Sequence, residues 1–366
     1  MNTWDVPEFV RLGFNNKKYI NLQREKILER MDSFRGGKLY LEIGGKFPYD
    51  PHAARVLPGL DPYAKKEILK NLSNVFEIVF CINAKDIASD RRLESNGDGY
   101  KKKVLDKLED LKKHFGAVSA ISVNLCTSEL NPEVENYLKK LKVLGYKIYK
   151  RYVIDGYPHD TEKVLSETGY GGDDYIETEK NLVIVTGPAS NSGKLSTCLG
   201  QLYYDNKKGL NSGYAKFETF PIWSLPLPHP VNLAYEAATA DIGDYNQLDA
   251  YHEKAYGKRA VNYNRDIEAF EIVKKLTSQF LPKDNFMHNY LSPTDMGISW
   301  AGFAINNDEV VCIASLNEIT RRKDWYAGLR GKDTSEWVSR CQNLENQALK
   351  YIKERNYNPE LVIRKA

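Results

Sequence analysis

The stretch NLVIVTGPASNSGKLSTCLGQLYYDNKKG, residues 181–209, decides how this sequence folds. It begins with NLVIV, a nearly continuous apolar run that predicts a buried strand. A turn containing glycine follows, and from residue 195 the apolar residues recur at the three- and four-residue spacing of a helix. The stretch therefore predicts a strand, a turn and a helix in that order, which is the repeating unit of α/β proteins.

The turn within this unit has the features of a phosphate-binding loop. Gly187 and Gly193 permit backbone conformations closed to other residues, Asn191 or Ser192 can cap the helix, and Lys194 stands at its mouth. Backbone N–H groups and the positive end of a helix bind phosphate oxygens, and a lysine neutralises the outer phosphates. The residues expected to contact the phosphates are Gly187, Ser190, Asn191, Ser192, Gly193, Lys194, Ser196 and Thr197. The alternative is a strand-to-helix corner in which glycine allows tight packing and Lys194 faces solvent.

Two features of this loop differ from the common G-x4-G-K-[ST] pattern. Five residues separate Gly187 from Gly193, a longer loop that resembles the one in dethiobiotin-synthetase-type ATPases. Leu195 stands where a Mg²⁺-binding serine or threonine belongs, and Ser196 is rotated by about 100° around the helix axis. The sequence therefore predicts an anion site for ATP, another nucleotide or a simpler phosphate compound, with Mg²⁺ left open.

The rest of the chain extends the α/β pattern. Apolar strands alternate with helices of 10 to 15 residues before the loop, which predicts a doubly wound, mainly parallel sheet. We expect a Rossmann-like domain at 1–155, a second α/β domain with the P-loop-like turn and a mixed helical segment at 156–330, and a helical tail at 331–366. ISWAGFAINNDEVVCIA, residues 298–314, predicts a β-hairpin with an Asn-Asn turn.

Composition restricts the partners of the protein. The 366 residues carry 52 basic and 49 acidic side chains, a net charge of +3 that gives no reason to expect nucleic acid or an anionic membrane. The five cysteines are scattered, the N-terminus lacks the apolar segment of a secretory signal, and no apolar run approaches the roughly 18 residues needed to span a bilayer. We therefore expect a cytoplasmic protein with a small-molecule substrate.

Four further residues are candidates for catalysis beside Lys194. Asp155 follows the strand RYVID and is expected at the carboxyl edge of the sheet, where it could hold Mg²⁺; a turn-starting aspartate is the alternative. Asp295, in the loop SPTDMG, is a candidate base or metal ligand, or part of an ordinary turn. Arg265 could grip a phosphate or carboxylate with its guanidinium fork, and His52 could act as acid or base.

Other chemistry receives less support from the residues. Lys216 and Glu218 lie two apart on one face of a strand, which is typical of a salt bridge and also allows substrate contact at a sheet edge. The six histidines are far apart in sequence and there is no HExxH or CxxC, so no zinc is expected. Cys198 follows the loop and could be an activated nucleophile, but it belongs to the apolar stripe of its helix, which favours core packing.

Several long strings in the sequence resemble a known family. LYLEIGGK, HAARVLPGLDP, VTGPASNSGKLSTCLGQLY, GYAKFETFPIWSLPLPHPVNLAYEAATAD, AVNYNRDIEAF and SPTDMG are similar to a bacterial family known as domain of unknown function 1846. The resemblance runs from about residue 12 to about 330, and it implies that typical members have a further C-terminal region that is not expected within these 366 residues. It supports an α/β fold, while function has to be argued from the site.

These observations favour an enzyme that binds a nucleotide or another phosphorylated ligand, with ATP-dependent phosphoryl transfer or ligation as the reaction. In either reaction Lys194 would stabilise the transferred group, and Arg265 or His52 would orient the second substrate. One alternative is a hydrolase or amide-bond enzyme that uses Cys198 or a distant triad. The other is a non-catalytic ligand-binding or assembly protein, whose partners would include further copies of the chain in a homo-oligomer.

Overall fold

A computed structural model describes residues 5–44, 46–72, 75–92 and 98–365. Seven of its strands form one sheet in the order β4-β3-β2-β5-β1-β6-β9, and every neighbouring pair is parallel. Their bounds are Leu39–Ile43 (β1), Phe76–Asn83 (β2), Ala120–Cys126 (β3), Ile148–Tyr152 (β4), Leu182–Thr186 (β5), Gly213–Phe217 (β6) and Gly297–Ile298 (β9). The α/β class and the parallel sheet predicted from the sequence are confirmed.

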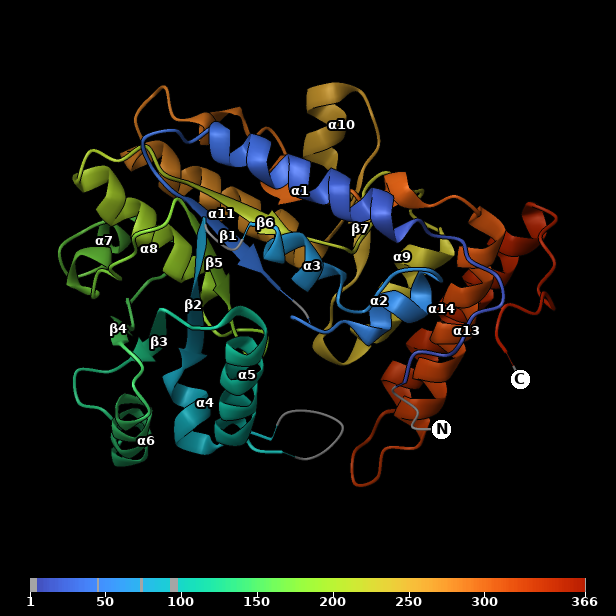
Figure 1. The fold of residues 1–366 in the computed structure, drawn as a ribbon, viewed down its shortest axis with the longest axis horizontal. Coiled ribbons are helices and arrows are strands. Elements are labelled where there is room, and N and C mark those ends of the chain that lie inside the picture. Colours follow the sequence, from blue (N-terminus) through green and yellow to red (C-terminus); the bar gives the residue numbers. More distant parts are fainter. Residues whose placement is uncertain (1–4, 45, 73–74, 93–97, 366) are drawn as a thin grey trace.

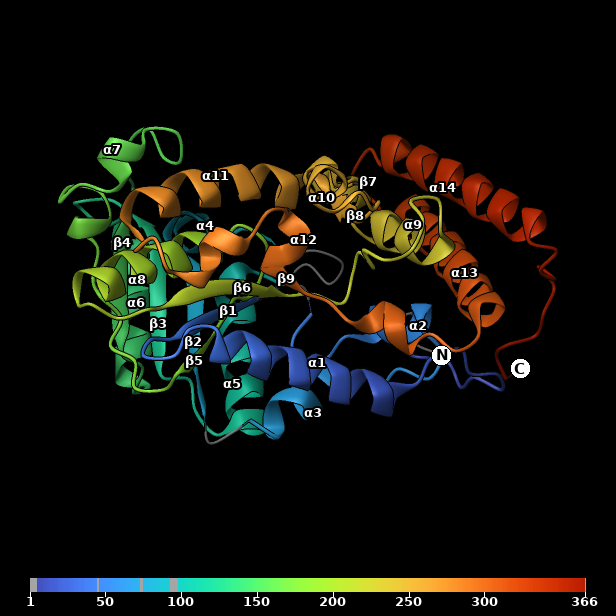
Figure 2. The same cartoon turned by 90° about the horizontal axis from the view of Figure 1, so that it is seen from above.

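Helices cover both faces of this sheet. Figure 2 shows α1, α3 and α5 on one face and α8 and α11 on the other. The helices before the loop are Asn16–Asp32 (α1), Pro51–Val56 (α2), Ala64–Lys70 (α3), Ala84–Ser89 (α4), Tyr100–Phe115 (α5), Pro132–Val143 (α6) and Thr161–Val164 (α7). Those after it are Lys194–Lys207 (α8), Pro230–Ala238 (α9), Ala250–Tyr256 (α10), Asn264–Phe280 (α11), Pro293–Met296 (α12), Asp308–Ala327 (α13) and Ser335–Glu354 (α14). The core strands β1 and β5 are buried along their whole length because both faces are covered.

The strand that opens the decisive stretch lies in the middle of the sheet. β5 sits between β2 and β1, so strands from both sides of the predicted boundary at residue 155 share one sheet. The chain leaves β2 toward β3 and leaves β5 toward β6, in opposite directions across the sheet. In open α/β sheets the carboxyl ends of two such strands border a crevice that binds ligands.

The C-terminal part is more helical, as the sequence indicates. α9, α13 and α14 pack together at one end of the molecule, and α2 lies against α13 (Figure 1). A short antiparallel pair, β7 (Asn246–Leu248) and β8 (Val261–Tyr263), precedes α11. No helix within the described ranges is long and apolar enough to cross a membrane.

The predicted hairpin at 298–314 is wrong. Asn307 caps α13 by accepting a hydrogen bond from the N–H of Val310, and Asp308 and Glu309 occupy the first turn, where the helix dipole favours acids. Residues 310–315 are all buried, so the helix begins with a continuous apolar run. Such a run does not distinguish a buried strand from a buried helix.

Candidate functional site

A cavity of about 710 Å³ opens at the carboxyl ends of the parallel strands. Its walls come from the ends of β1, β3, β4 and β6 on the sheet side and from α9, α11 and α13 on the other side. Seven cationic side chains and five carboxylates are among the described residues that line it, so its wall carries both signs of charge. The volume is in the usual range for a small-molecule site, about 300–1,000 Å³.

The loop between β5 and α8 forms part of this wall. The carbonyl of Asn191 accepts a hydrogen bond from the Asn83 amide at 3.1 Å, and the carbonyl of Ser192 accepts one from the Asn124 amide at 2.9 Å. Gly193 adopts φ +84°, and a Cβ there would lie 2.4 Å from Cγ of Asn124. The ends of β2 and β3 therefore fix the path of the loop, and only glycine fits at its last position.

The N-terminus of α8 faces the cavity without a side-chain cap. Gly193 is the N-cap residue and no side chain accepts a hydrogen bond there, while Lys194, Leu195 and Ser196 of the first turn line the cavity. Nζ of Lys194 is 3.7 Å from Oε1 of Glu42, too far for a hydrogen bond. The first N–H groups of the helix, its dipole and the lysine together form an electropositive end of the cavity.

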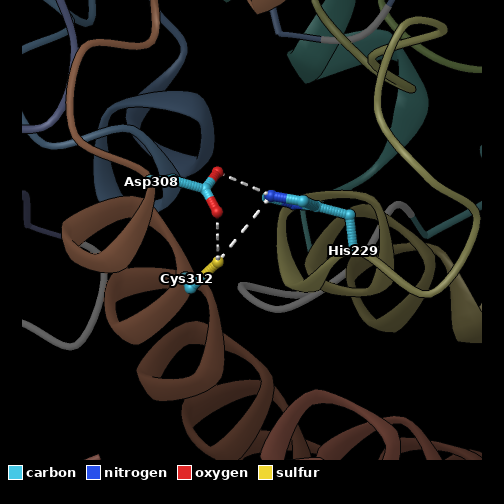
Figure 3. A group of neighbouring side chains, drawn as sticks. All are labelled: His229, Asp308 and Cys312. Atoms are coloured by element: carbon cyan, nitrogen blue, oxygen red, sulfur yellow. Dashed lines mark hydrogen bonds and ion pairs between the residues drawn. The ribbon is translucent and has the colours of Figure 1, made fainter. Parts of the chain in front are cut away.

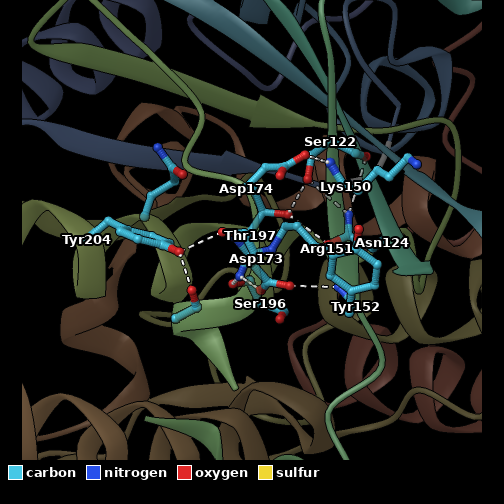
Figure 4. Close-up of polar contacts among 12 residues, drawn as sticks. Ser122, Asn124, Lys150, Arg151, Tyr152, Asp173, Asp174, Ser196, Thr197 and Tyr204 are labelled. Atoms are coloured by element: carbon cyan, nitrogen blue, oxygen red, sulfur yellow. Dashed lines mark hydrogen bonds and ion pairs between the residues drawn. The ribbon is translucent and has the colours of Figure 1, made fainter. Parts of the chain in front are cut away.

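Arg151, the penultimate residue of β4, adds a guanidinium group next to this end of the cavity. Figure 4 shows its guanidinium beside Asp173 and Ser196: Nη2 lies 2.8 Å from Oδ2 of Asp173 and donates to the carbonyl of Ser196 at 3.1 Å. The residue is 1% exposed and lines the cavity, and its Nε and Nη1 have no hydrogen-bond partner among the described residues. Buried donors of this kind require an acceptor, which a bound anion would supply.

A second charged group occupies another part of the wall. Lys216 at the end of β6 contacts Asp266 of α11 and the hydroxyl of Tyr263, and its Nζ is 3.0 Å from Oε1 of Glu218. Burial raises the pKa of Glu218 well above its ordinary value, Lys216 lowers it, and Asp266 raises it further. The pKa of Lys216 is also well above its usual range, because the two carboxylates outweigh its burial. Glu218 thus gives up its proton less readily than an exposed glutamate does, and a carboxyl group with a raised pKa is what a general acid requires.

The third group on the wall is His52 with Glu318 of α13. Nδ1 of His52 lies 2.9 Å from Oε1 of Glu318, which is fully buried. Arg55 and Arg321 donate to the same carboxylate, at 2.9 and 2.7 Å to Oε2. These hydrogen bonds outweigh burial and hold the pKa of Glu318 well below its ordinary value. Glu318 is therefore an anion that orients both the histidine and the two arginines.

The comparison with known proteins gives the family. The N-terminal domain of the family described as domain of unknown function DUF1846 matches residues 12–348. The chain belongs to the DUF1846 family. It is 45% identical over 313 residues to a UPF0371 protein of Clostridioides difficile (strain 630), which covers 86% of this chain and 61% of that protein. It is 47% identical over 314 residues to a UPF0371 protein of Streptococcus pyogenes serotype M5 (strain Manfredo), 85% of this chain and 62% of that protein. The chain thus spans about three fifths of the length of these relatives, and their names give no activity.

The structure brings some of the predicted site residues of this DUF1846 chain together and leaves others apart. Lys194 and His52 line the same cavity, as do Ser190, Asn191, Gly193 and Ser196. Arg265 lines it too, with Nη2 2.5 Å from Oδ2 of Asp244. Three of the predicted loop residues are not among the described lining residues: Gly187, Ser192 and Thr197.

These three supporting residues have structural partners. Ser192 donates its hydroxyl to the carbonyl of Ala189 at 2.8 Å, and Thr197 donates to Oδ1 of Asn124 at 3.1 Å. A Cβ at Gly187 would lie 2.6 Å from the carbonyl oxygen of Cys81, so glycine is needed there for close packing. These three residues therefore hold the loop in place and are not among the described residues that line the cavity.

The two aspartates proposed as metal or base candidates lie outside the cavity of the DUF1846 chain. The side chain of Asp155 is 91% exposed and pairs with Lys163 at 2.8 Å. Asp295 forms a capping box with Ser292 at α12 and accepts from Tyr256 at 2.9 Å. Neither is among the described lining residues, so the turn interpretation that the sequence left open describes them better.

Cys198 is part of the core. It is fully buried, it is not among the described residues of the cavity wall, and burial raises the pKa of its thiol well above the ordinary value. A thiol in this position is protonated at neutral pH and inaccessible, so it does not provide the nucleophile that the hydrolase alternative requires.

One group of metal-binding residue types lies away from the cavity. Nε2 of His229 is 2.9 Å from Oδ1 of Asp308, and Sγ of Cys312 is 3.7 Å from the same nitrogen (Figure 3). Nδ1 of His229 accepts the N–H of Val231, so Nε2 carries the proton and donates it to Asp308. Burial also raises the pKa of Cys312. Both ring nitrogens are thus in use, and the group caps α9 and joins it to α13.

Sequence reasoning missed Glu318, Arg151 and Asp266 as members of the site. Arg151 had one signal: it is a charged residue near the end of the predicted strand KIYKRYVID. Glu318 had none, because its partners His52 and Arg55 lie some 260 residues away in the sequence. Asp266 lies in the first turn of α11, and its side chain contacts Lys216.

Proposed function

We propose that the protein is an enzyme that binds a nucleotide or another phosphorylated small molecule in this cavity, with the phosphates at the N-terminus of α8. The observation that carries the proposal is the uncapped first turn of α8 facing the cavity beside buried Arg151. Helix N–H groups, Lys194 and an arginine fork each favour a phosphate group, and here all three come together. The loop would then act as a P-loop-like anion cradle.

The reaction we propose first is phosphoryl transfer or ligation with ATP. Lys194 would neutralise charge on the transferred group, and the loop would position it. Leu195 lines the cavity and supplies no hydroxyl for Mg²⁺, so phosphate binding at this loop is expected to be independent of the metal. Glu218 and Asp266 would take up and return a proton of the second substrate.

Ligand-dependent stability tests this proposal. We expect ATP, ADP, GTP or pyrophosphate at 100 times its dissociation constant to raise the free energy of unfolding by about 2.7 kcal/mol, with or without Mg²⁺. Lys194→Ala should weaken binding of that ligand by about 10- to 100-fold, because a charge-assisted contact worth about 1.5–3 kcal/mol is lost. Thermal unfolding and calorimetric titration measure both effects.

Lys207→Ala is the matched control, since Lys207 lies at the other end of α8 and pairs with exposed Glu167. This variant should bind as the wild type does. Equal binding by Lys194→Ala would remove the loop from the site. If no nucleotide or pyrophosphate stabilises the folded wild type, the cavity does not recognise phosphate.

A further inference from the structure

The two ring nitrogens of His52 differ in their hydrogen bonding. Its Nδ1 is bonded to Glu318, while Nε2 has no hydrogen-bond partner among the residues that the structure describes. The residue is 6% exposed and lines the cavity next to Phe220, whose ring centroid is 5.9 Å from the imidazole. A buried acceptor or donor of this kind takes its partner from water or from a ligand in the cavity.

The partners of Glu318 decide which nitrogen carries the proton. Because this carboxylate is ionised and accepts hydrogen bonds from Arg55 and Arg321, it can only accept from Nδ1 as well. Burial lowers the pKa of His52 to about 4, Glu318 raises it, Arg322 lowers it and Asp50 raises it. At neutral pH the imidazole is therefore neutral, with the proton on Nδ1 and a lone pair on Nε2.

We propose that the ligand of this cavity presents an O–H or N–H group to Nε2 of His52, which makes His52 a specificity-determining residue and Glu318 its positioning residue. The proposal deepens the proposed function and rests on it for the phosphate end of the ligand. A site built to hydrogen-bond a donor rejects an analogue that lacks it, because the buried acceptor then stays unpaired. The preferred class is thus a phosphorylated compound with hydroxyl or amino groups, in preference to an alkyl phosphate.

Imidazole ¹⁵N spectra of the protein labelled in histidine test the acceptor directly, with His52→Phe to assign the signals. We expect Nδ1 of His52 to be protonated and Nε2 to be unprotonated from pH 8 to pH 5. His229 is the internal control, because its Nδ1 accepts from Val231 and its proton belongs on Nε2, the opposite tautomer. A protonated Nε2 on His52, or titration near the ordinary histidine pKa of about 6.5, would overturn the proposal.

Calorimetry with glucose 6-phosphate and hexyl phosphate tests the ligand class, since both carry one phosphate and six carbons. The wild type should bind glucose 6-phosphate about tenfold more tightly, for one hydrogen bond of about 1–1.5 kcal/mol. In His52→Phe the ratio of the two affinities should fall from about ten to about one, because the acceptor is gone. An equal affinity of the wild type for both, or a preference that survives in His52→Phe, contradicts the proposal.

A third probe separates failure of this inference from failure of the proposed function. Methyl glucoside carries the same kind of hydroxyl groups without phosphate. Suppose that glucose 6-phosphate and hexyl phosphate do not bind but the glucoside shifts the Nε2 signal of His52. His52 is then confirmed as the acceptor, and the phosphate site of the proposed function is wrong. If none of the three probes shifts that signal, the acceptor role of His52 is wrong. If glucose 6-phosphate and hexyl phosphate bind with equal affinity, the phosphate site is supported, and only the role of His52 in specificity is contradicted.

Discussion

Glu318→Gln should lower the free energy of unfolding by about 3–5 kcal/mol, the cost of breaking a buried ion pair by removing one partner. The carboxylate is fully buried and accepts hydrogen bonds from Arg55, Arg321 and His52. Glutamine keeps the shape of the side chain but removes the charge that faces two guanidinium groups. Urea unfolding at pH 7 measures the loss.

Glu354→Gln on α14 is the matched control for this substitution. Glu354 is exposed and its carboxylate is 3.8 Å from Nζ of Lys350, so its loss should change stability by less than about 1 kcal/mol. A similar small change in Glu318→Gln would mean that Glu318 does not hold the arginines and the histidine together.

The pH dependence of the same pair of proteins gives a second check. The pKa of Glu318 is depressed in the folded state, so its contribution is present above the unfolded pKa of about 4.3 and is lost as the pH falls through the folded pKa. The difference between wild type and Glu318→Gln should therefore stay constant from pH 7 to pH 5. A difference that already narrows between pH 7 and pH 5 would contradict an ionised, depressed Glu318.

The strands and most helices follow from local patterns, and the site follows only in part. β5 and α8 are visible in the sequence because an apolar run, two glycines and a helical stripe occur in succession. The position of Lys194 at the mouth of α8 follows from the same pattern. What the sequence does not contain is the order of strands, which places β5 between β2 and β1 and lets Asn83 and Asn124 fix the loop.

Two of the predicted site residues have local partners outside the cavity, and one expected pair gains partners that are distant in sequence. Asp155 follows β4, as the sequence indicates, but its exposed carboxylate pairs with Lys163, which lies eight residues further along the chain. Asp295 has the spacing of a capping box with Ser292, a local signal that outweighs the functional interpretation. Lys216 and Glu218 were expected to pair, and they do. Asp266 of α11 and Tyr263 of β8, some 50 residues further along the chain, join the pair only in the folded protein.

Lys216→Met should cost about 3–5 kcal/mol of stability at pH 8, because two buried carboxylates lose the cation between them. Without the lysine, which lowers it, the pKa of Glu218 in the folded state is raised further by burial and by the neighbouring Asp266. A group with a raised folded pKa contributes stability that is present below its unfolded pKa and is lost as the pH rises through the folded pKa. The deficit of the variant should therefore be smaller at pH 5 than at pH 8, which urea unfolding across this range measures.

Two further proteins decide whether the carboxylates are the cause. Lys207→Met removes an exposed lysine that pairs with Glu167, and should cost less than about 1 kcal/mol with no trend between pH 5 and pH 8. Adding Asp266→Asn to Lys216→Met should recover part of the loss at pH 8, because one of the two unpaired charges is then gone. A deficit in Lys216→Met that is the same at every pH would trace to packing of the lysine stem. In that case the charges of Glu218 and Asp266 would not depend on Lys216, and the cavity would lose its candidate for acid–base chemistry.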